Sequence, residues 1–231
     1  MNNDYMKLKE FWNKSFILTE EAKKEIEEYN PNTEYEILAP SQKLINACKE
    51  LANKELVLDY GAGFGFASII MAKNGCNNII AFDTSANAKD LAMYYANYFK
   101  IENKINYIVS DDNWLNKEPS NKYDGIFCSN VLDVLPIDIS KNIIKELYRI
   151  SKNDALIIIG LNYYVEPDKI PLVDGKKTNC IYIDGILRLT SLSDNEWLDL
   201  FNDYFELIKL EFFAWPGEEK ESRILFYLKK K

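Results

Sequence analysis

The sequence predicts an α/β protein built on a doubly wound, mostly parallel sheet with helices on both faces. Three observations support this fold class. Short apolar segments alternate with amphipathic ones between residues 55 and 161, as in a parallel sheet covered by crossover helices. The first apolar segment runs into a turn with three glycines, Gly61, Gly63 and Gly65, and a helical pattern follows. Two strand-like segments joined by a short turn end the sequence, which predicts an antiparallel hairpin.

Composition limits the possible functions. The 231 residues are 47% apolar, which predicts one globular domain with a sizeable core. The formal net charge of −8 argues against a nucleic-acid partner, because phosphates favour a basic surface. No CxxC pair occurs among the four cysteines, so a reducing, cytoplasmic location is expected. No signal-peptide pattern and no run of ~20 apolar residues is present, so no membrane association is expected.

The sequence contains no histidine. Ser-His-Asp and Cys-His nucleophiles are therefore excluded, and so are histidine ligands to a metal, and no metal site is predicted. Any proton transfer must use a carboxylate, a tyrosine, a lysine or water.

Residues 1–40 are predicted to form a helical accessory segment that precedes the main domain, 41–231. Thr19 is placed to cap a charged helix that ends before Pro31. Apolar residues recur at helical intervals ahead of it: Tyr5, Leu8, Trp12 and Phe16.

Capping residues and apolar runs order the elements of the main domain. Helices are expected after Ser41, after Ser85 and after either Asp138 or Ser140, and Ser193 with Glu196 forms a capping box. Strands are expected at 57–60, 78–83, 105–112, from 123, and at 155–161, 205–215 and 223–228.

Residues 162–191 are longer than a usual connection and predict an insertion after the fifth strand. Two β-prone runs flank Asp184-Gly185, a dipeptide typical of hairpin turns. Ligands bind at the carboxyl ends of the strands in open α/β sheets, so a hairpin here would form a lid or specificity wall. A dimerisation arm, and with it a homodimer, is the alternative.

The spacing of the glycines separates two ligand classes. A dinucleotide fingerprint places its third glycine three residues after the second, where this chain has Phe66. Here Gly65 is the third glycine, and Asp59 stands two residues before the first. With Asp83 ending the next strand, this pattern resembles motif I of the class I S-adenosylmethionine-dependent methyltransferases. Those proteins have a Rossmann-like, seven-stranded sheet whose last strand is antiparallel, so the C-terminal hairpin also fits. A nicotinamide-dependent dehydrogenase is disfavoured.

The resemblance implies S-adenosyl-L-methionine as cofactor and assigns roles to particular residues. Asp59 would act indirectly near the methionyl amino group, and Asp83 would accept the ribose hydroxyls. Asp111, or alternatively Asp112, would accept the adenine amino group. The full set of cofactor-binding candidates is Asp59, Gly61, Gly63, Gly65, Asp83, Thr84, Asp111, Asp112 and Asn130.

The segment after the fourth strand and the start of the insertion are expected to border the methyl acceptor. Asp133 is a candidate base, or an acid that starts a helix, and Asn130 could orient the acceptor. Tyr163 is the third catalytic candidate. Tyr164 and Arg188 could also reach inward from the insertion. The N-terminal helix either covers the cofactor mouth, as in the family that the chain resembles, or packs on the flank of the sheet.

The function expected from these features is methylation of a small-molecule acceptor. Two alternatives remain open: a non-catalytic protein that binds S-adenosylmethionine or S-adenosylhomocysteine, and a methyltransferase acting on a macromolecule. Val131-Leu132 follows Asn130 where DNA amino methyltransferases have Pro-Pro-Tyr, which counts against a nucleic-acid base. The sequence does not identify the acceptor.

Overall fold

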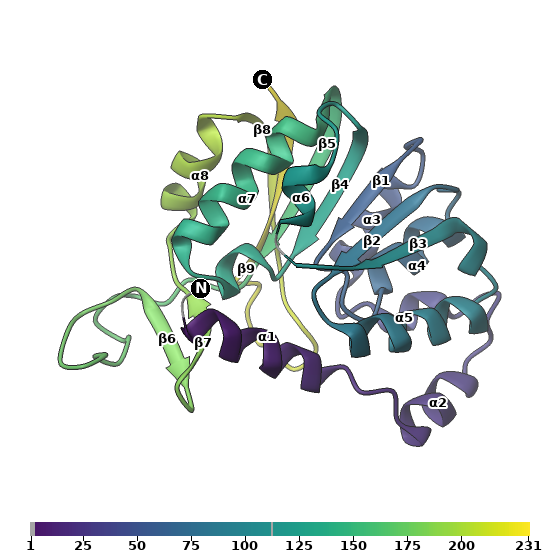
Figure 1. Ribbon diagram of the computed structural model, residues 1–231, viewed down its shortest axis with the longest axis horizontal. Helices are drawn as coiled ribbons and strands as arrows, with labels where there is room; N and C mark the ends of the chain where they lie inside the picture. The colour runs from purple at the N-terminus through teal and green to yellow at the C-terminus, as the bar shows by residue number, and fades with distance from the viewer. Residues whose placement is uncertain (1–2, 112) are drawn as a thin grey trace.

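A central seven-stranded sheet organises the protein, and the computed structural model describes residues 3–111 and 113–231 (Figure 1). The strand order is β3-β2-β1-β4-β5-β9-β8, in which β9 is antiparallel to both of its neighbours and the remaining pairs are parallel. The doubly wound sheet and its C-terminal antiparallel hairpin confirm the predicted fold class. The strands are β1 Val57–Tyr60, β2 Ile79–Asp83, β3 Ile105–Val109, β4 Tyr123–Ser129, β5 Ser151–Leu161, β8 Phe205–Phe213 and β9 Arg223–Lys230.

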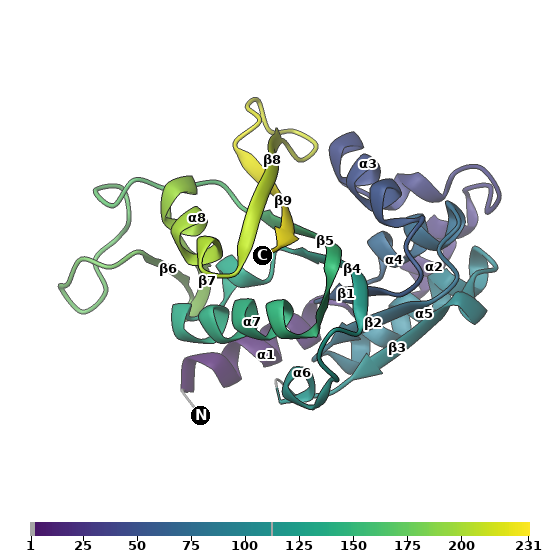
Figure 2. The same cartoon turned by 90° about the horizontal axis from the view of Figure 1, so that it is seen from above.

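Helices cover both faces of this sheet (Figure 2). The helices α3, α4 and α5 pack on one face, and α6, α7 and α8 pack on the other. Among the described residues, no helix combines the length and the apolar character needed to cross a membrane. The helices are α1 Asn3–Ser15, α2 Glu20–Glu27, α3 Gln42–Leu51, α4 Phe66–Lys73, α5 Ala86–Tyr98, α6 Trp114–Lys117, α7 Ile137–Ile150 and α8 Asp194–Asn202, with short 3-10 turns η1 Tyr35–Leu38, η2 Glu102–Lys104 and η3 Leu132–Val134.

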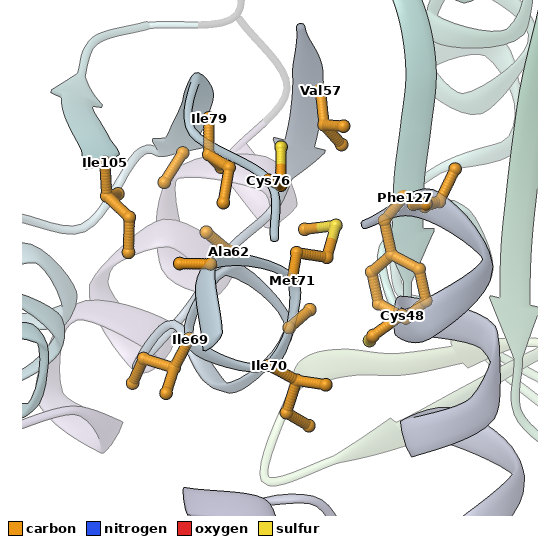
Figure 3. Packing of buried hydrophobic residues seen from close by; sticks show 14 of the residues in the cluster. Cys48, Val57, Ala62, Ile69, Ile70, Met71, Cys76, Ile79, Ile105 and Phe127 are labelled. Atoms are coloured by element: carbon orange, nitrogen blue, oxygen red, sulfur yellow. The ribbon is translucent and has the colours of Figure 1, made fainter. Parts of the chain in front are cut away.

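Alternation along each strand creates the two cores. Val57 and Phe127 face α3 and α4, whereas their neighbours Leu58 and Cys128 face the opposite core. Figure 3 shows the first core, in which Met71 of α4 lies among side chains from the sheet and from α3. Because nearly all of these side chains are buried, the edge of the sheet that carries the glycine turn rests on a rigid support.

Local sequence signals account for most helix starts. Side chains of Thr19, Ser41 and Ser85 accept hydrogen bonds from the first turns of α2, α3 and α5, as predicted, and the Ser193–Glu196 capping box begins α8. The predicted start of α7 at Asp138 or Ser140 is wrong, because the helix begins at Ile137 directly after Pro136.

The reason for the earlier start of α7 is the hydroxyl of Ser140. That hydroxyl is buried and donates to the carbonyl oxygen of Leu132 (2.6 Å), so it ties the helix to η3 instead of capping it. The strand β5 also begins earlier than predicted, since Ser151 already pairs with Tyr123.

The insertion after β5 contains an antiparallel hairpin of β6 (Cys180–Ile183) and β7 (Ile186–Thr190), separate from the main sheet. Asp184 and Gly185 have φ values of 52° and 70°, and a two-residue hairpin turn requires a positive φ at both positions. β7 packs against α1 and η3, and its Leu187 and Leu189 are buried. Figure 1 shows this hairpin beside α1, below the ends of β4 and β5.

Candidate active site

The turn after β1 brings backbone to the carboxyl edge of the sheet. The amides of Gly61 and Ala62 both donate to the carbonyl oxygen of Phe82 (2.8 and 2.9 Å), which fixes the turn on β2. Gly61 has a φ of 74°, and a Cβ there would lie 2.2 Å from Cγ2 of Val131. Gly63 also has a positive φ, with the ring of Phe16 above it. Only glycine fits Gly61 without strain, so bare backbone faces the space beyond.

Asp83 ends β2 beside this turn. Its carboxylate accepts from the amides of Gly63 (2.9 Å) and Ser85 (2.9 Å), and each oxygen retains capacity for a further hydrogen bond. Burial raises the pKa of Asp83, and these amide hydrogen bonds partly oppose that shift. Both Asp83 and Thr84 line a cavity at this edge of the sheet.

Asp59 lies behind the glycine turn and does not line the cavity. Its carboxylate is 2% exposed and accepts from the amide (3.1 Å) and the hydroxyl (2.6 Å) of Ser68 in the first turn of α4. Burial raises the pKa of Asp59 to about 6. The side chain therefore joins β1 to the N-terminus of α4, where the helix dipole favours an acid.

Asp111 follows β3 at the carboxyl end of the strand. Asp111 is exposed and accepts from the amide of Asn113 (3.1 Å), and Asp112 lies outside the described residues. Asp111 does not line the cavity. Trp114 stacks on Phe82, with ring centroids 4.6 Å apart, which places the tryptophan in the core.

Asn130 follows β4 in a left-handed conformation, with a φ of 57°, that asparagine tolerates better than most residues. Its amide donates to the carbonyl oxygen of Gly160 (2.8 Å), and its side chain donates to Oδ1 of Asn162 (2.8 Å). Asn130 and Asn162 both line the cavity. The carboxyl ends of β4 and β5 are thereby joined by side-chain amides.

Asp133 is buried behind Asn162, at 1% exposure, and does not line the cavity. Its Oδ2 accepts from the backbone amide (2.5 Å) and the side-chain amide (2.7 Å) of Asn162. Its Oδ1 has no hydrogen-bond partner among the described residues. Burial raises the pKa of Asp133 to about 6, against the lowering effect of the Asn162 amides. Asp133 therefore fixes the position of Asn162 and does not itself face a ligand in the cavity.

The buried carboxyl of Asp133 should make stability depend on pH. Its pKa rises from an ordinary 3.8 to about 6 on folding. The neutral Asp133 carboxyl therefore makes its full contribution to the free energy of unfolding below the pKa of the unfolded state. This contribution is lost as the pH rises through about 6. Two pKa units correspond to about 3 kcal/mol. Between pH 4 and pH 7.5, wild type should lose about this much free energy of unfolding relative to Asp133→Asn in urea titrations.

The exposed Asp154 supplies the control for this experiment, because Asp154→Asn should keep the wild-type pH dependence. A difference between wild type and Asp133→Asn that stays constant across this pH range would contradict the assignment.

Asn162, Trp215 and Arg223 are among the cavity residues that the sequence analysis did not identify. The guanidinium of Arg223 is 5% exposed, forms a paired ion contact with Glu218 (2.6 to 3.0 Å) and lies 3.6 Å from the ring centroid of Trp215. It also donates to Oδ1 of Asn162. The only sequence signal was an arginine at the start of a fully apolar strand, where a buried charge requires a partner.

The cavity has a volume of about 750 Å³, within the usual range of ligand sites. Its floor is the edge of the sheet, and its other walls come from α1, residues 37–44, the β6–β7 hairpin and the β8–β9 turn. Of the aromatic pair after β5, Tyr163 lines the cavity, whereas Tyr164 does not. Arg188 of β7 also lines the cavity, as do residues of α1: Tyr5, Leu8, Lys9 and Trp12, with Phe16 just beyond.

Comparisons with known proteins bear on this geometry. Residues 57–154 match the family model described as "Methyltransferase domain". Over this segment, which is less than half of the chain, the protein is similar to methyltransferase domains. The glycine turn and Asp83, which resemble an S-adenosylmethionine motif, lie within it. The matched segment contains the glycine turn, Asp83 and Asn130, so it includes the cofactor edge of the cavity and stops short of the hairpin.

Solved structures share the fold. A Mesorhizobium loti S-adenosylmethionine-dependent methyltransferase superposes with a TM-score of 0.63 at 15% identity, over 84% of this chain and 100% of the other. The Burkholderia thailandensis 1,6-didemethyltoxoflavin-N1-methyltransferase was solved with 1,6-didemethyltoxoflavin and S-adenosylhomocysteine bound. It superposes with a TM-score of 0.62 at 12% identity, over 84% of this chain and 79% of the other. The [4+2]-cyclase SpnF superposes with a TM-score of 0.58 at 18% identity, and the match covers 74% of this chain but only 60% of SpnF. A search of curated proteins found no match.

The residues present fit the cofactor. S-adenosylmethionine carries no phosphate, so its site needs close backbone approach and hydrogen-bond acceptors more than cationic side chains. A Cβ at Gly61 would collide with Val131, so the turn presents bare backbone, and the Asp83 carboxylate lines the cavity beside it. Five of the predicted cofactor-binding residues line the cavity, whereas three described ones do not: Gly61, Gly63, Asp83, Thr84 and Asn130 line it, and Asp59, Gly65 and Asp111 lie outside its lining.

Proposed function

We propose that this methyltransferase methylates a small organic molecule bound in the same cavity as the cofactor. One observation carries the proposal: a single cavity extends from Gly61 and Asp83 to Arg188 of the hairpin and Arg223 of β9. The two ligands would therefore meet inside walls formed by this chain. Enclosure by α1 and the hairpin favours a small acceptor over a macromolecular one.

On this proposal, Asp83 accepts the ribose hydroxyls, with Thr84 beside it, and the glycine turn contacts the methionyl part. Asp111 is left to accept the adenine amino group from the rim, after a change in its side-chain position, since its carboxylate now bonds Asn113. Asp59 would act indirectly, by holding α4 and the glycine turn in register.

Methyl transfer from a sulfonium requires that the acceptor atom approach in line with the sulfur–methyl bond, so alignment and exclusion of water supply much of the acceleration. We assign the aligning role to Asn130 and Tyr163, which line the cavity. Asp133 was a candidate base. Its burial supports a positioning role instead, through Asn162, which in turn bonds Asn130.

The small-molecule proposal is supported by the Burkholderia thailandensis enzyme, which has the same fold and holds both a small acceptor and S-adenosylhomocysteine. The likeness to a [4+2]-cyclase shows that this fold also serves other chemistry, so the acceptor must be sought by experiment.

Calorimetry with three ligands tests the proposal. S-adenosylmethionine and S-adenosylhomocysteine are expected to bind, whereas NAD is not, because Phe66 replaces the third glycine of a dinucleotide turn. A screen of small-molecule acceptors for S-adenosylhomocysteine release then tests turnover. Binding of NAD without any response to S-adenosylhomocysteine would overturn the cofactor assignment. Cofactor binding with methylation only of protein or nucleic acid would overturn the small-molecule proposal.

A further inference from the structure

The charged side chains of the cavity have an uneven distribution. Among the described residues that line it, Asp83 is the only carboxylate, and it stands at the cofactor end. The cations Lys9, Arg188 and Arg223 line the rest. The charged lining side chains of this part of the cavity are therefore positive, in a chain whose net charge is −8. The acceptor part of the cavity is therefore electrostatically suited to an anion.

Arg223 is not the cation that an anionic ligand would meet first. Its guanidinium is already paired with Glu218 along one edge and bonded to Asn162 on the other. The ring of Trp215 covers its face. These contacts neutralise Arg223 and make it part of the wall that holds Asn162 in place.

Arg188 differs from Arg223 in its surroundings. It lies on β7, half-buried, with its guanidinium carbon 4.0 Å from the ring centroid of Phe11 and 5.9 Å from that of Trp12. No carboxylate among the described residues forms an ion pair with it. Stacking on a ring occupies a face of the guanidinium and leaves its edge N–H groups available to an acceptor.

A half-buried guanidinium without a counter-ion leaves hydrogen-bonding capacity unused, and an anionic group in the cavity would use it. Around Arg188 the lining is apolar and aromatic, which suits the body of an organic acid. Trp12, Val134, Leu135, Ile181 and Leu189 are among the lining residues of this part of the cavity.

We propose that the methyl acceptor is an organic anion whose carboxylate or phosphate group pairs with Arg188 while its apolar body lies against α1 and the hairpin. The inference rests on the proposed function and specifies its substrate class. Arg188 is then a specificity-determining residue, since it selects for negative charge on the acceptor.

Three matched probes test this assignment by calorimetry on the protein saturated with S-adenosylhomocysteine: 2-naphthoate, 2-naphthyl phosphate and the neutral 2-naphthamide. At least one anion should bind about tenfold or more tightly than the amide, as one charge-assisted hydrogen-bonded pair provides. Arg188→Met should remove this preference and change the affinity for the amide less than about twofold. Arg188→Lys should retain part of the preference. The better of the two anions distinguishes a carboxylate from a phosphate acceptor.

Lys177→Met, an exposed change in the same insertion, is the matched control and should leave all three affinities unchanged. Equal binding of the three probes, binding of none of them, or an anion preference that survives in Arg188→Met would each overturn the proposal. Binding of S-adenosylhomocysteine is measured separately in every variant. Its loss from wild type would count against the proposed function, whereas its retention without an anion preference would count against the role of Arg188 alone.

Discussion

Asp83→Ala is expected to weaken the binding of S-adenosylhomocysteine at least a hundredfold. The carboxylate would accept two ribose hydroxyls in a nearly buried position, and each charge-assisted hydrogen bond contributes about 1.5–3 kcal/mol. It also accepts from the amides of Gly63 and Ser85, so its removal releases the glycine turn and the start of α5 together. Calorimetric titration of wild type and variant measures the change.

Two further variants separate ligand binding from folding in this experiment. Asp83→Asn keeps one acceptor oxygen and should lose less affinity than Asp83→Ala. Asp111→Ala changes an exposed acid at the rim and should have a smaller effect than either. An unchanged dissociation constant in a folded Asp83→Ala protein would show that the cofactor ribose lies elsewhere.

Gly61→Ala is expected to lower the free energy of unfolding by about 2–5 kcal/mol and to impair cofactor binding. A left-handed backbone costs an alanine about 1–2 kcal/mol. The new methyl group would also lie 2.2 Å from Cγ2 of Val131, and overpacking of this kind costs about 1–3 kcal/mol. Urea titration gives the stability, and calorimetry with S-adenosylhomocysteine gives the affinity.

The backbone and steric parts of this loss can be measured separately. Gly175 has the same φ of 74° with nothing within 4 Å of its Cβ position, so Gly175→Ala should show the backbone cost alone. Val131→Ala combined with Gly61→Ala should recover the steric part, as a favourable coupling in a double-mutant cycle. If Gly61→Ala is no more costly than Gly175→Ala, the contact with Val131 does not constrain the turn.

Much of the fold could be predicted because its signals are local. The glycine turn, the apolar strands and the capping residues Ser41, Ser85 and Ser193 each depend on only a few neighbouring positions. The start of α7 could not be predicted in this way. It depends on a hydrogen bond from Ser140 to η3, and nothing in the residues around Ser140 separates that bond from an ordinary cap.

The same contrast between local signals and long-range contacts separates the site residues that could be predicted from those that could not. Gly61 and Asp83 belong to a contiguous motif, so their neighbourhood was evident from the sequence. The wall of Asn162, Trp215 and Arg223 comes from the end of β5 and the β8–β9 turn, and these meet only because β9 inserts beside β5. The burial of Asp133 also depends on this meeting, because Asn162 covers it. Neither contact can be predicted from the spacing of residues along the chain.

The packing of α1 against β7 has a consequence for the order of folding. The two elements come from opposite regions of the chain, so their contact closes a long loop and is entropically expensive until the sheet between them exists. Asn13 of α1 bonds the start of α5, and Arg188 covers Phe11, so the helix is anchored at widely separated points of the sequence. We therefore expect the cavity to form late in folding and to be lost early in partial unfolding. A ligand held beneath α1 therefore stabilises the least stable part of the molecule, and the amides of α1 and β7 should gain hydrogen-exchange protection together when S-adenosylhomocysteine binds.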